Sequence, residues 1–322
     1  MNPQILKSAP PILKDFLGYM QTIKGKSPKT VDEYYFDLRT FFRYIKFSKE
    51  LIPKNTNFEE ILIDDVTLDQ IKEISLTDLY DYLNFLLTTR DNSAVTRARK
   101  ISSLKSFYNY LTNKTHQLDK NPTKELDRPK KKYALPKFLS LEQSIDLLKA
   151  VDGPFKERDY CILTLFLNCG MRLSELVGIN LSDISSENTL KVTGKGNKER
   201  MIYLNDACIA AIEKYLKVRP VDGVTDRNAL FISKRKKRIS PKTVQFLVYK
   251  YLSNINLNGQ GYSVHKLRHT AATLMYQHGN VDIRILKDIL GHSNLGTTEI
   301  YTHLSDAQIK KAVSLNPLAK IK

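Results

Sequence analysis

The residues between 31 and 45 restrict the fold of this chain most, because their apolar side chains recur with the period of an α-helix. They follow the spacing i, i+3, i+4, i+7 through two repeats: Val31, Tyr34, Tyr35, Leu38, Phe41, Phe42 and Ile45. Ser27 and Pro28 precede them and provide an N-cap and a first helical residue. The spacing predicts an amphipathic helix, and with it a helical first domain.

Three other stretches in the first part of the chain show the same spacing. Residues 11–24, 77–87 and 93–111 each place apolar side chains on one helical face. Residues 48–74 are less regular and contain a proline, which predicts an insertion between helices. We therefore predict an all-helical domain over residues 1–122.

A basic stretch with two prolines follows at residues 123–138 and predicts a linker between two domains. Its charge run, RPKKK at residues 128–132, fits a clamp around a polyanion as well as it fits any solvated linker. Ser140 begins a capping box, which marks the start of a second domain. We expect this domain to cover residues 139–304 and a tail to cover residues 305–322.

One β element interrupts the helices of the second domain. Two short β-prone runs at residues 189–193 and 200–204 flank a turn rich in Gly, Asn and charge, which predicts a hairpin. The expected fold class is therefore mainly α (α+β), with a small β-sheet in the second domain.

The chain carries 51 Lys and Arg against 34 Asp and Glu, a net charge of +17. Such a charge attracts polyanions, and nucleic acid is the first candidate; a basic but otherwise ordinary surface is the alternative. The three cysteines are odd in number and lack CxxC spacing, which favours a reducing compartment over a disulfide framework or a zinc site. No secretory signal or long apolar run is evident, so we expect a cytoplasmic protein.

Two basic segments are candidate DNA contacts. The first is the polar face of the helix expected at 93–111, with Thr96, Arg97, Arg99, Lys100 and Lys105. The second is a basic turn and the helix start after it, with Lys234, Arg235, Lys236, Lys237, Arg238 and Lys242. Both would place Lys and Arg on phosphates, and a helix N-terminus also suits an anion. A solvated helix face and a solvated loop are the alternatives.

A further set of residues, expected near helix ends, has the side chains needed to cleave a phosphodiester with a protein nucleophile: Arg172, His265, Arg268, His292 and Tyr301. A tyrosine hydroxyl retains the phosphoryl group as an ester, and two guanidiniums can hold its non-bridging oxygens. The leaving 5′-oxygen needs a proton from a Lys or a His. No HExxH motif, carboxylate cluster or cysteine pair signals a metal, so we expect no metal or nucleotide cofactor.

Four motifs in this order resemble those of the tyrosine recombinases, and in particular the bacterial Xer site-specific recombinases. They are GMRLSEL at residues 170–176, GKGNKER at 194–200, HKLRH at 265–269, and LGH at 290–292 with IYTH at 300–303. Each motif alone has an ordinary structural explanation, but their joint order is specific. The resemblance covers nearly the whole chain.

The resemblance implies roles for the site residues. Tyr301 would be the nucleophile that forms a 3′-phosphotyrosyl link and frees a 5′-hydroxyl, and Lys195 the general acid for that oxygen. Arg172 and Arg268 would clamp the phosphate. His265 would be a general base or a further clamp, and His292 a hydrogen-bond donor in the transition state. Glu175 would be a supporting residue, because it can pair with Arg172 three residues before it.

The resemblance also implies an architecture and an assembly. A SAM-like helical core-binding domain and a mixed catalytic domain would form a clamp around double-stranded DNA. Four subunits, identical or shared with a second recombinase, would exchange strands through a four-way junction. Residues 305–322 would dock on a neighbouring subunit. A DNA translocase that activates the reaction stays an open alternative.

The most specific function that the resemblance implies is resolution of chromosome dimers at a dif-like site. The alternatives are the integrase of a phage or conjugative element, a DNA-binding relative without catalysis, and a type IB topoisomerase. The helical pattern begins near residue 11, which we expect to leave no room for the arm-binding domain that many integrases carry. Residues 48–74 lengthen the first domain, and Gly296 stands where the family pattern has a Ser.

Overall fold

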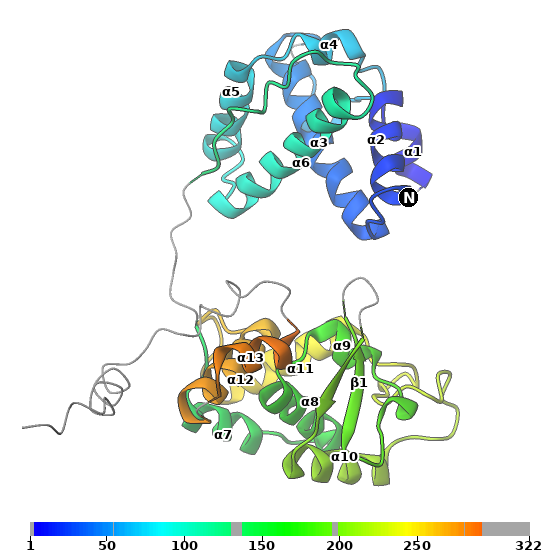
Figure 1. Cartoon of the computed structure of the whole chain (residues 1–322), viewed down its shortest axis with the longest axis vertical. Coiled ribbons are helices and arrows are strands. Elements are labelled where there is room, and N and C mark those ends of the chain that lie inside the picture. Colours follow the sequence, from blue (N-terminus) through cyan, green and yellow to red (C-terminus); the bar gives the residue numbers. More distant parts are fainter. Residues whose placement is uncertain (1–2, 54, 130–136, 195–198, 280, 292–322) are drawn as a thin grey trace, which may run out of the picture. The chain divides into compact units, whose positions relative to one another are not determined.

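The computed structural model describes residues 3–53, 55–129, 137–194, 199–279 and 281–291 (Figure 1). The chain forms two compact units, Met1–Tyr133 and Ala134–Lys322. The described residues are mainly helical with one two-stranded antiparallel sheet, which confirms the predicted fold class. None of the described helices is both long enough and apolar enough to cross a bilayer.

The first unit is built on four long helices, α2 (Pro11–Thr22), α3 (Pro28–Ser48), α5 (Leu76–Thr88) and α6 (Ala94–Asn113). Ser27 caps α3, because its hydroxyl accepts a hydrogen bond from the amide of Thr30, and Pro28 occupies the first turn. The predicted apolar stripe of α3 is buried except for Tyr34, which is half-buried. The helix and its orientation toward the core are as predicted.

Residues 48–74 are more ordered than the predicted insertion. They contain a 3₁₀ turn at Phe58–Glu60 and helix α4 (Leu68–Lys72), which begins with a capping box between Thr67 and Gln70. Five apolar residues of this segment are buried: Ile61, Ile63, Val66, Ile71 and Ile74. The segment therefore covers part of the first core.

Short segments near both ends of the first unit also pack into its core. Helix α1 (Pro3–Ser8) precedes residue 11, and Ile5 in it belongs to the core. At the other end, Leu118 and Leu126 pack into the same core, so packed chain continues past residue 122. Short and irregular segments of this kind contain too few residues to show a helical period.

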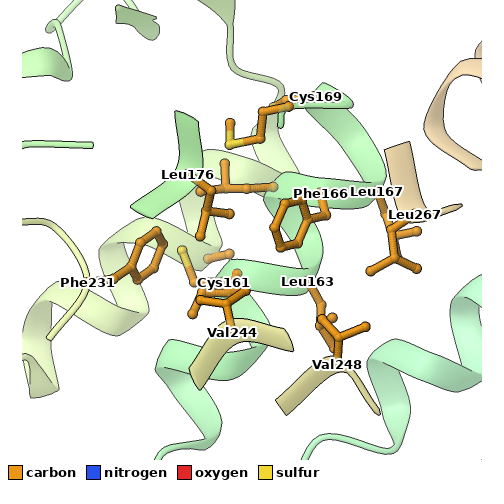
Figure 2. Packing of buried hydrophobic residues seen from close by; sticks show 14 of the residues in the cluster. Cys161, Leu163, Phe166, Leu167, Cys169, Leu176, Phe231, Val244, Val248 and Leu267 are labelled. Atoms are coloured by element: carbon orange, nitrogen blue, oxygen red, sulfur yellow. The ribbon is translucent and has the colours of Figure 1, made fainter. Parts of the chain in front are cut away.

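The second unit is arranged around α8 (Lys156–Cys169), a helix with ten of its fourteen residues buried. The other helices are α7 (Leu141–Lys149), α9 (Leu173–Gly178), the 3₁₀ turn Leu181–Asp183, α10 (Asp206–Val218), α11 (Pro241–Asn254), α12 (Val264–His278) and α13 (Ile283–Leu290). Figure 2 shows Cys161, Leu163 and Phe166 of α8 packed among Leu176 of α9, Val244 and Val248 of α11, and Leu267 of α12. Helix α8 therefore joins the elements that carry the predicted site.

The predicted hairpin is confirmed. Strands β1 (Thr189–Thr193) and β2 (Glu199–Tyr203) pair in antiparallel register, with Leu190 opposite Ile202. Both of these residues are buried, so one face of the hairpin packs on the core. Arg200 lies two residues before Ile202 and therefore points to the same side of the strand.

Candidate active site

Arg172 lies at the junction of α8 and α9. Helix α8 ends at Cys169, and Gly170 follows in a left-handed conformation with φ +57°, as the sequence predicts for this position. The chain then turns, and Arg172 becomes the N-cap residue of α9. Its side chain is 35% exposed, so the guanidinium reaches solvent.

Glu175 lies one turn further along α9, and its carboxylate is fully buried. Oε2 accepts a hydrogen bond from the backbone amide of Arg172 at 2.7 Å, and Oε1 accepts one from Arg172 Nη1, also at 2.7 Å. Arg200 binds both carboxylate oxygens, Nη1 to Oε1 at 2.6 Å and Nη2 to Oε2 at 3.0 Å. Burial alone would raise the pKa of Glu175, but the hydrogen bonds from Arg200 and Arg172 outweigh it and lower the pKa. The carboxylate is therefore ionised.

Arg268 reaches the same place from α12, and its side chain is almost completely buried. Nη1 donates a hydrogen bond to the carbonyl oxygen of Gly170 at 2.7 Å, and Nη2 donates one to that of Leu290 at 2.5 Å. Nη1 also lies 4.0 Å from Oε2 of Glu175. The two predicted phosphate clamps, Arg172 and Arg268, are thus brought to one carboxylate.

The C-terminal end of α13 receives three guanidiniums. The donor–acceptor pairs are Arg200 Nε to Ile289 O, Arg268 Nη2 to Leu290 O and Arg172 Nη2 to Gly291 O, at 3.3, 2.5 and 3.0 Å. The last carbonyls of a helix lack partners within it and carry the negative end of its dipole. Gly291 ends the helix with φ +62°, as the sequence predicts, and His292 is the next residue of the chain.

His265 lies on the first turn of α12, and its imidazole reaches solvent. The ring packs edge-on against that of His269, with 4.6 Å between centroids. Partial burial lowers the pKa of His265, and the charges of Arg268, Lys266 and Arg172 lower it further. The imidazole is therefore mainly neutral near pH 7 and can accept a proton or a hydrogen bond.

The structure brings together three of the predicted site residues, Arg172, Glu175 and Arg268, and His265 lies three residues before Arg268 on α12. The predicted pairing of Arg172 with Glu175 is confirmed. Lys195, His292 and Tyr301 lie outside the described residues.

Both units of the chain match models of one protein family. The model described as "Phage integrase family" matches residues 137–308, and "Phage integrase, N-terminal SAM-like domain" matches residues 12–117. Tyrosine recombinase XerC of Caldanaerobacter subterraneus subsp. tengcongensis is 57% identical over 311 residues, which cover 97% of this chain and 88% of that protein. The chain belongs to the phage integrase family of tyrosine recombinases.

Other members of the family agree with this assignment. Tyrosine recombinase XerC of Psychromonas ingrahamii is 37% identical over 292 residues, covering 88% of this chain and 97% of that protein. The structure of the XerH site-specific recombinase bound to a palindromic difH substrate covers 94% of this recombinase and 83% of that chain, with a TM-score of 0.71 at 21% identity, and supports the fold. As a family member, the chain is a site-specific DNA recombinase, which confirms the predicted enzyme class.

The prediction that Lys100 of this recombinase contacts DNA is wrong. Its side chain is buried, and Nζ lies 3.1 Å from Oδ1 of Asp37, which is itself 2% exposed. The other oxygen of Asp37 accepts hydrogen bonds from Arg99 Nη1 at 2.6 Å and Ser103 Oγ at 2.8 Å. Lys100 neutralises a buried carboxylate between α3 and α6, so its ammonium is not available to a phosphate.

Arg238 also has partners within the recombinase, and its contact with DNA stays a prediction. Its Nε lies 2.8 Å from Oδ2 of Asp226, and Nη2 donates a hydrogen bond to the side chain of Asn180 at 2.6 Å. Nη1 donates to the carbonyl oxygens of Val177 and Ile179 at 3.1 and 3.0 Å. The guanidinium is therefore fixed by packing within the recombinase, because each of its nitrogens has a partner.

The remaining predicted DNA contacts are exposed or half-exposed: Thr96, Arg97, Arg99, Lys105, Lys234, Arg235, Lys236, Lys237 and Lys242. Four of them form one turn, which is closed by a hydrogen bond from the amide of Ser233 to the carbonyl of Lys237 at 2.8 Å. Their contact with DNA stays a prediction.

Arg200 is a site residue of the recombinase that the sequence reasoning misses. The signal that could have found it is the alternation of β2, because Arg200 is in phase with the buried Ile202. An arginine on the inward face of a strand needs a charged or hydrogen-bonding partner, and Glu175 is that partner here.

Proposed function

We propose that this recombinase cuts and rejoins DNA at a specific site through a 3′-phosphotyrosyl intermediate on Tyr301. The observation that carries the proposal is the convergence of Arg172 and Arg268 on the buried carboxylate of Glu175. Two guanidiniums with fixed positions suit the two non-bridging oxygens of one phosphate, and neither loses its charge near neutral pH. The proposed reaction therefore needs no metal or other cofactor to neutralise the phosphate.

The phosphate would be bound by exchange of hydrogen-bond partners. Arg172 is 35% exposed and donates Nη2 to the carbonyl of Gly291, whereas Arg268 donates Nη2 to that of Leu290. A phosphate oxygen has the same acceptor character as these carbonyls and carries a full charge, which makes the new bonds stronger. DNA binding would thus transfer N–H groups from the end of α13 to the scissile phosphate.

The reaction proceeds in two symmetrical transfers. In the first, the phenolate oxygen of Tyr301 attacks the phosphorus, the P–O5′ bond breaks, and the leaving oxygen takes a proton from Lys195. The neutral imidazole of His265 either accepts the phenolic proton or binds the phosphate, and His292 donates a hydrogen bond to the transition state. In the second transfer, the 5′-hydroxyl of another strand attacks the phosphotyrosyl ester and releases Tyr301.

The proposed substrate is a dif-like chromosomal site, and the proposed role is resolution of chromosome dimers in the cytoplasm. The support is the match to two XerC proteins over nearly their whole length. Four subunits would act on two sites through a four-way junction, with residues 305–322 docked on a neighbour; a second recombinase or a DNA translocase would be a further partner. A chain that ends at residue 304 should then bind DNA without recombining it, and normal recombination by that truncated chain would contradict the docking.

The experiment that tests this function uses a labelled duplex with the dif-like site and a nick close to the cleavage position. The short fragment diffuses away after cleavage, so the covalent complex accumulates and survives denaturation. We expect a protein–DNA adduct with the wild-type chain and none with Tyr301→Phe, which should bind the duplex normally. The adduct should form equally well in the presence of EDTA.

Three other outcomes would change the assignment. Tight binding without an adduct would favour a DNA-binding relative without catalysis, or a requirement for a partner. Binding only to other sequences would favour the integrase of a mobile element. Relaxation of supercoiled DNA without site preference would favour a type IB topoisomerase.

A further inference from the structure

Arg200 connects three elements of the second unit through one side chain. It lies on β2, and its side chain is 15% exposed. Nη1 and Nη2 bind the two carboxylate oxygens of Glu175 on α9, and Nε donates to the carbonyl of Ile289 in the last turn of α13. Each of its three nitrogens therefore has a directed partner, on two different helices.

The turn at Gly291 packs directly on the same side chain. An added Cβ at Gly291 would lie 3.0 Å from Cδ and 3.2 Å from Nε of Arg200. This glycine has φ +62°, and the next residue is His292. The position of Arg200 is thus linked to the backbone that leads in the sequence to His292 and Tyr301, two further proposed catalytic residues.

The carboxylate that Arg200 holds also orients Arg172. Glu175 accepts two hydrogen bonds from Arg172, one from the backbone amide and one from Nη1. Because Arg200 binds both oxygens of this carboxylate, the carboxylate cannot rotate without losing a charge-assisted hydrogen bond. The orientation of Arg172 therefore depends on Arg200.

We propose that Arg200 is a positioning residue of the recombination reaction: through Glu175 and the end of α13, it holds Arg172 and Arg268 in the geometry that binds the scissile phosphate. The inference rests on the proposed function and gives Arg200 no contact with DNA. A lysine cannot replace it fully, because an ammonium lacks the planar fork that binds two carboxylate oxygens side by side.

The test compares DNA affinity with the rate of adduct formation on the nicked duplex at saturating full-length protein. We expect the adduct rate to fall about 100-fold in Arg200→Met and about tenfold in Arg200→Lys, with little change in affinity. Arg158→Lys is the matched control. Arg158 is also buried and binds a carboxylate and a carbonyl, those of Asp159 and Ile232. This control should unfold at a lower temperature and keep the wild-type adduct rate.

A double-mutant cycle with Glu175→Gln separates positioning from general structural support. If Arg200 acts through Glu175, the variant with both Arg200→Met and Glu175→Gln reacts no more slowly than the slower single variant. If the two losses multiply, Arg200 acts independently of Glu175, and the proposed positioning of Arg172 through Glu175 is overturned.

The pH profile of the adduct rate provides a readout that a purely structural role would not move. In the part of the chain that the structure describes, the charged groups that face Glu175 are the guanidiniums of Arg172, Arg200 and Arg268. In Arg200→Lys the burial of Glu175 is less well opposed, so the pKa of its carboxyl rises. The ratio of the Arg200→Lys rate to the wild-type rate, in which the titration of His265 in both proteins is divided out, should therefore fall as the pH is lowered, and a ratio that does not change with pH would contradict the proposal.

Wild-type protein and Tyr301→Phe are measured in parallel, so that the two proposals can fail separately. If the wild type forms no adduct, the proposed function is overturned. The proposed role of Arg200 in that reaction is then overturned as well. An adduct that forms at equal rates in the wild type and Arg200→Met overturns the Arg200 proposal alone. If Arg200→Met does not unfold cooperatively, the adduct rate and the pH profile of Arg200→Lys decide whether Arg200 is a positioning residue.

Discussion

The guanidinium of Arg268 lies 2.7 Å from the carbonyl oxygen of Gly170 and so connects α12 to the end of α8. Gly170 lacks a side chain at a point where an added Cβ would lie 2.8 Å from Cδ2 of Leu290. Its left-handed backbone leads to Arg172 two residues later. The conformation of one glycine therefore helps to set the distance between the two arginines of the site.

Gly170→Ala tests this relationship. We expect the free energy of unfolding to fall by about 3 kcal/mol, because the alanine is strained in the left-handed region and also meets Leu290. Gly259→Ala is the matched control, since Gly259 has φ +67° with nothing within 4 Å of an added Cβ, and it should cost about 1 kcal/mol. Urea denaturation of the full chain measures both. Equal losses would show that the contact with Leu290 is unimportant.

Glu175→Gln should destabilise the second unit by about 3 kcal/mol, because it removes a fully buried negative charge and leaves the largely buried Arg200 without its ionic partner. The exposed Glu187 provides the control Glu187→Gln, for which we expect no measurable change. The folded pKa of Glu175 is below its ordinary value of 4.5. Its contribution is therefore present above pH 4.5 and is lost as the pH falls through the folded pKa. Denaturation curves at several pH values should show this loss in the wild type and not in Glu175→Gln.

The lowered pKa of His265 predicts a second pH dependence of stability. The unfolded imidazole titrates near its ordinary value of 6.5 and the folded one at lower pH. Between these two values the unfolded chain binds more protons, so the free energy of unfolding decreases as the pH falls below 6.5. This decrease should disappear in His265→Gln and remain in His278→Gln, a control at the exposed end of α12. If it persists in His265→Gln, another group is its source.

The basic turn before α11 should bind phosphates through its exposed side chains. Lys234→Ala is expected to weaken DNA binding and to reduce the slope of log affinity against log salt by about 0.9, the value for one lost phosphate contact. Lys217→Ala, on the exposed face of α10, is the control and should leave the slope unchanged. Arg238→Ala should instead lower the melting temperature, because its guanidinium is held by Asp226 and by backbone carbonyls. A salt slope that is equal in Lys234→Ala and the wild type would remove this turn from the DNA interface.

The long helices of this chain are predictable because their signals are local. A 3.6-residue period and a Ser-Pro start define α3, and glycines end α8 and α13 where the sequence places them. Helix α4 has five residues, too few for a period, and its burial depends on contacts with residues far away in the chain. Helix α1 and the segment around Leu126 pack into the first core without such a signal.

The site residues also divide into those with a local sequence signal and those that depend on contacts between distant parts of the chain. The pairing of Arg172 with Glu175 follows from a separation of three residues, so it is predictable. The pairing of Arg200 with Glu175 spans 25 residues and exists only because the hairpin packs beside α9. Lys100 looks like a solvated cation in the sequence, and only the packing of α3 against α6 reveals Asp37 opposite it.

Glu175 and the three arginines that surround it form one charged cluster. Among the described residues of this cluster, Arg172, Arg200 and Arg268 contribute three positive charges and Glu175 one negative charge, which leaves a net charge of two. A phosphodiester carries one negative charge, and an attacking phenolate brings a second one into the transition state. A fixed charge that matches the transition state better than the bound substrate accelerates the reaction instead of merely tightening binding. In the proposed reaction, the buried carboxylate thus sets the charge of this cluster to match a species that exists only while a strand is being cut.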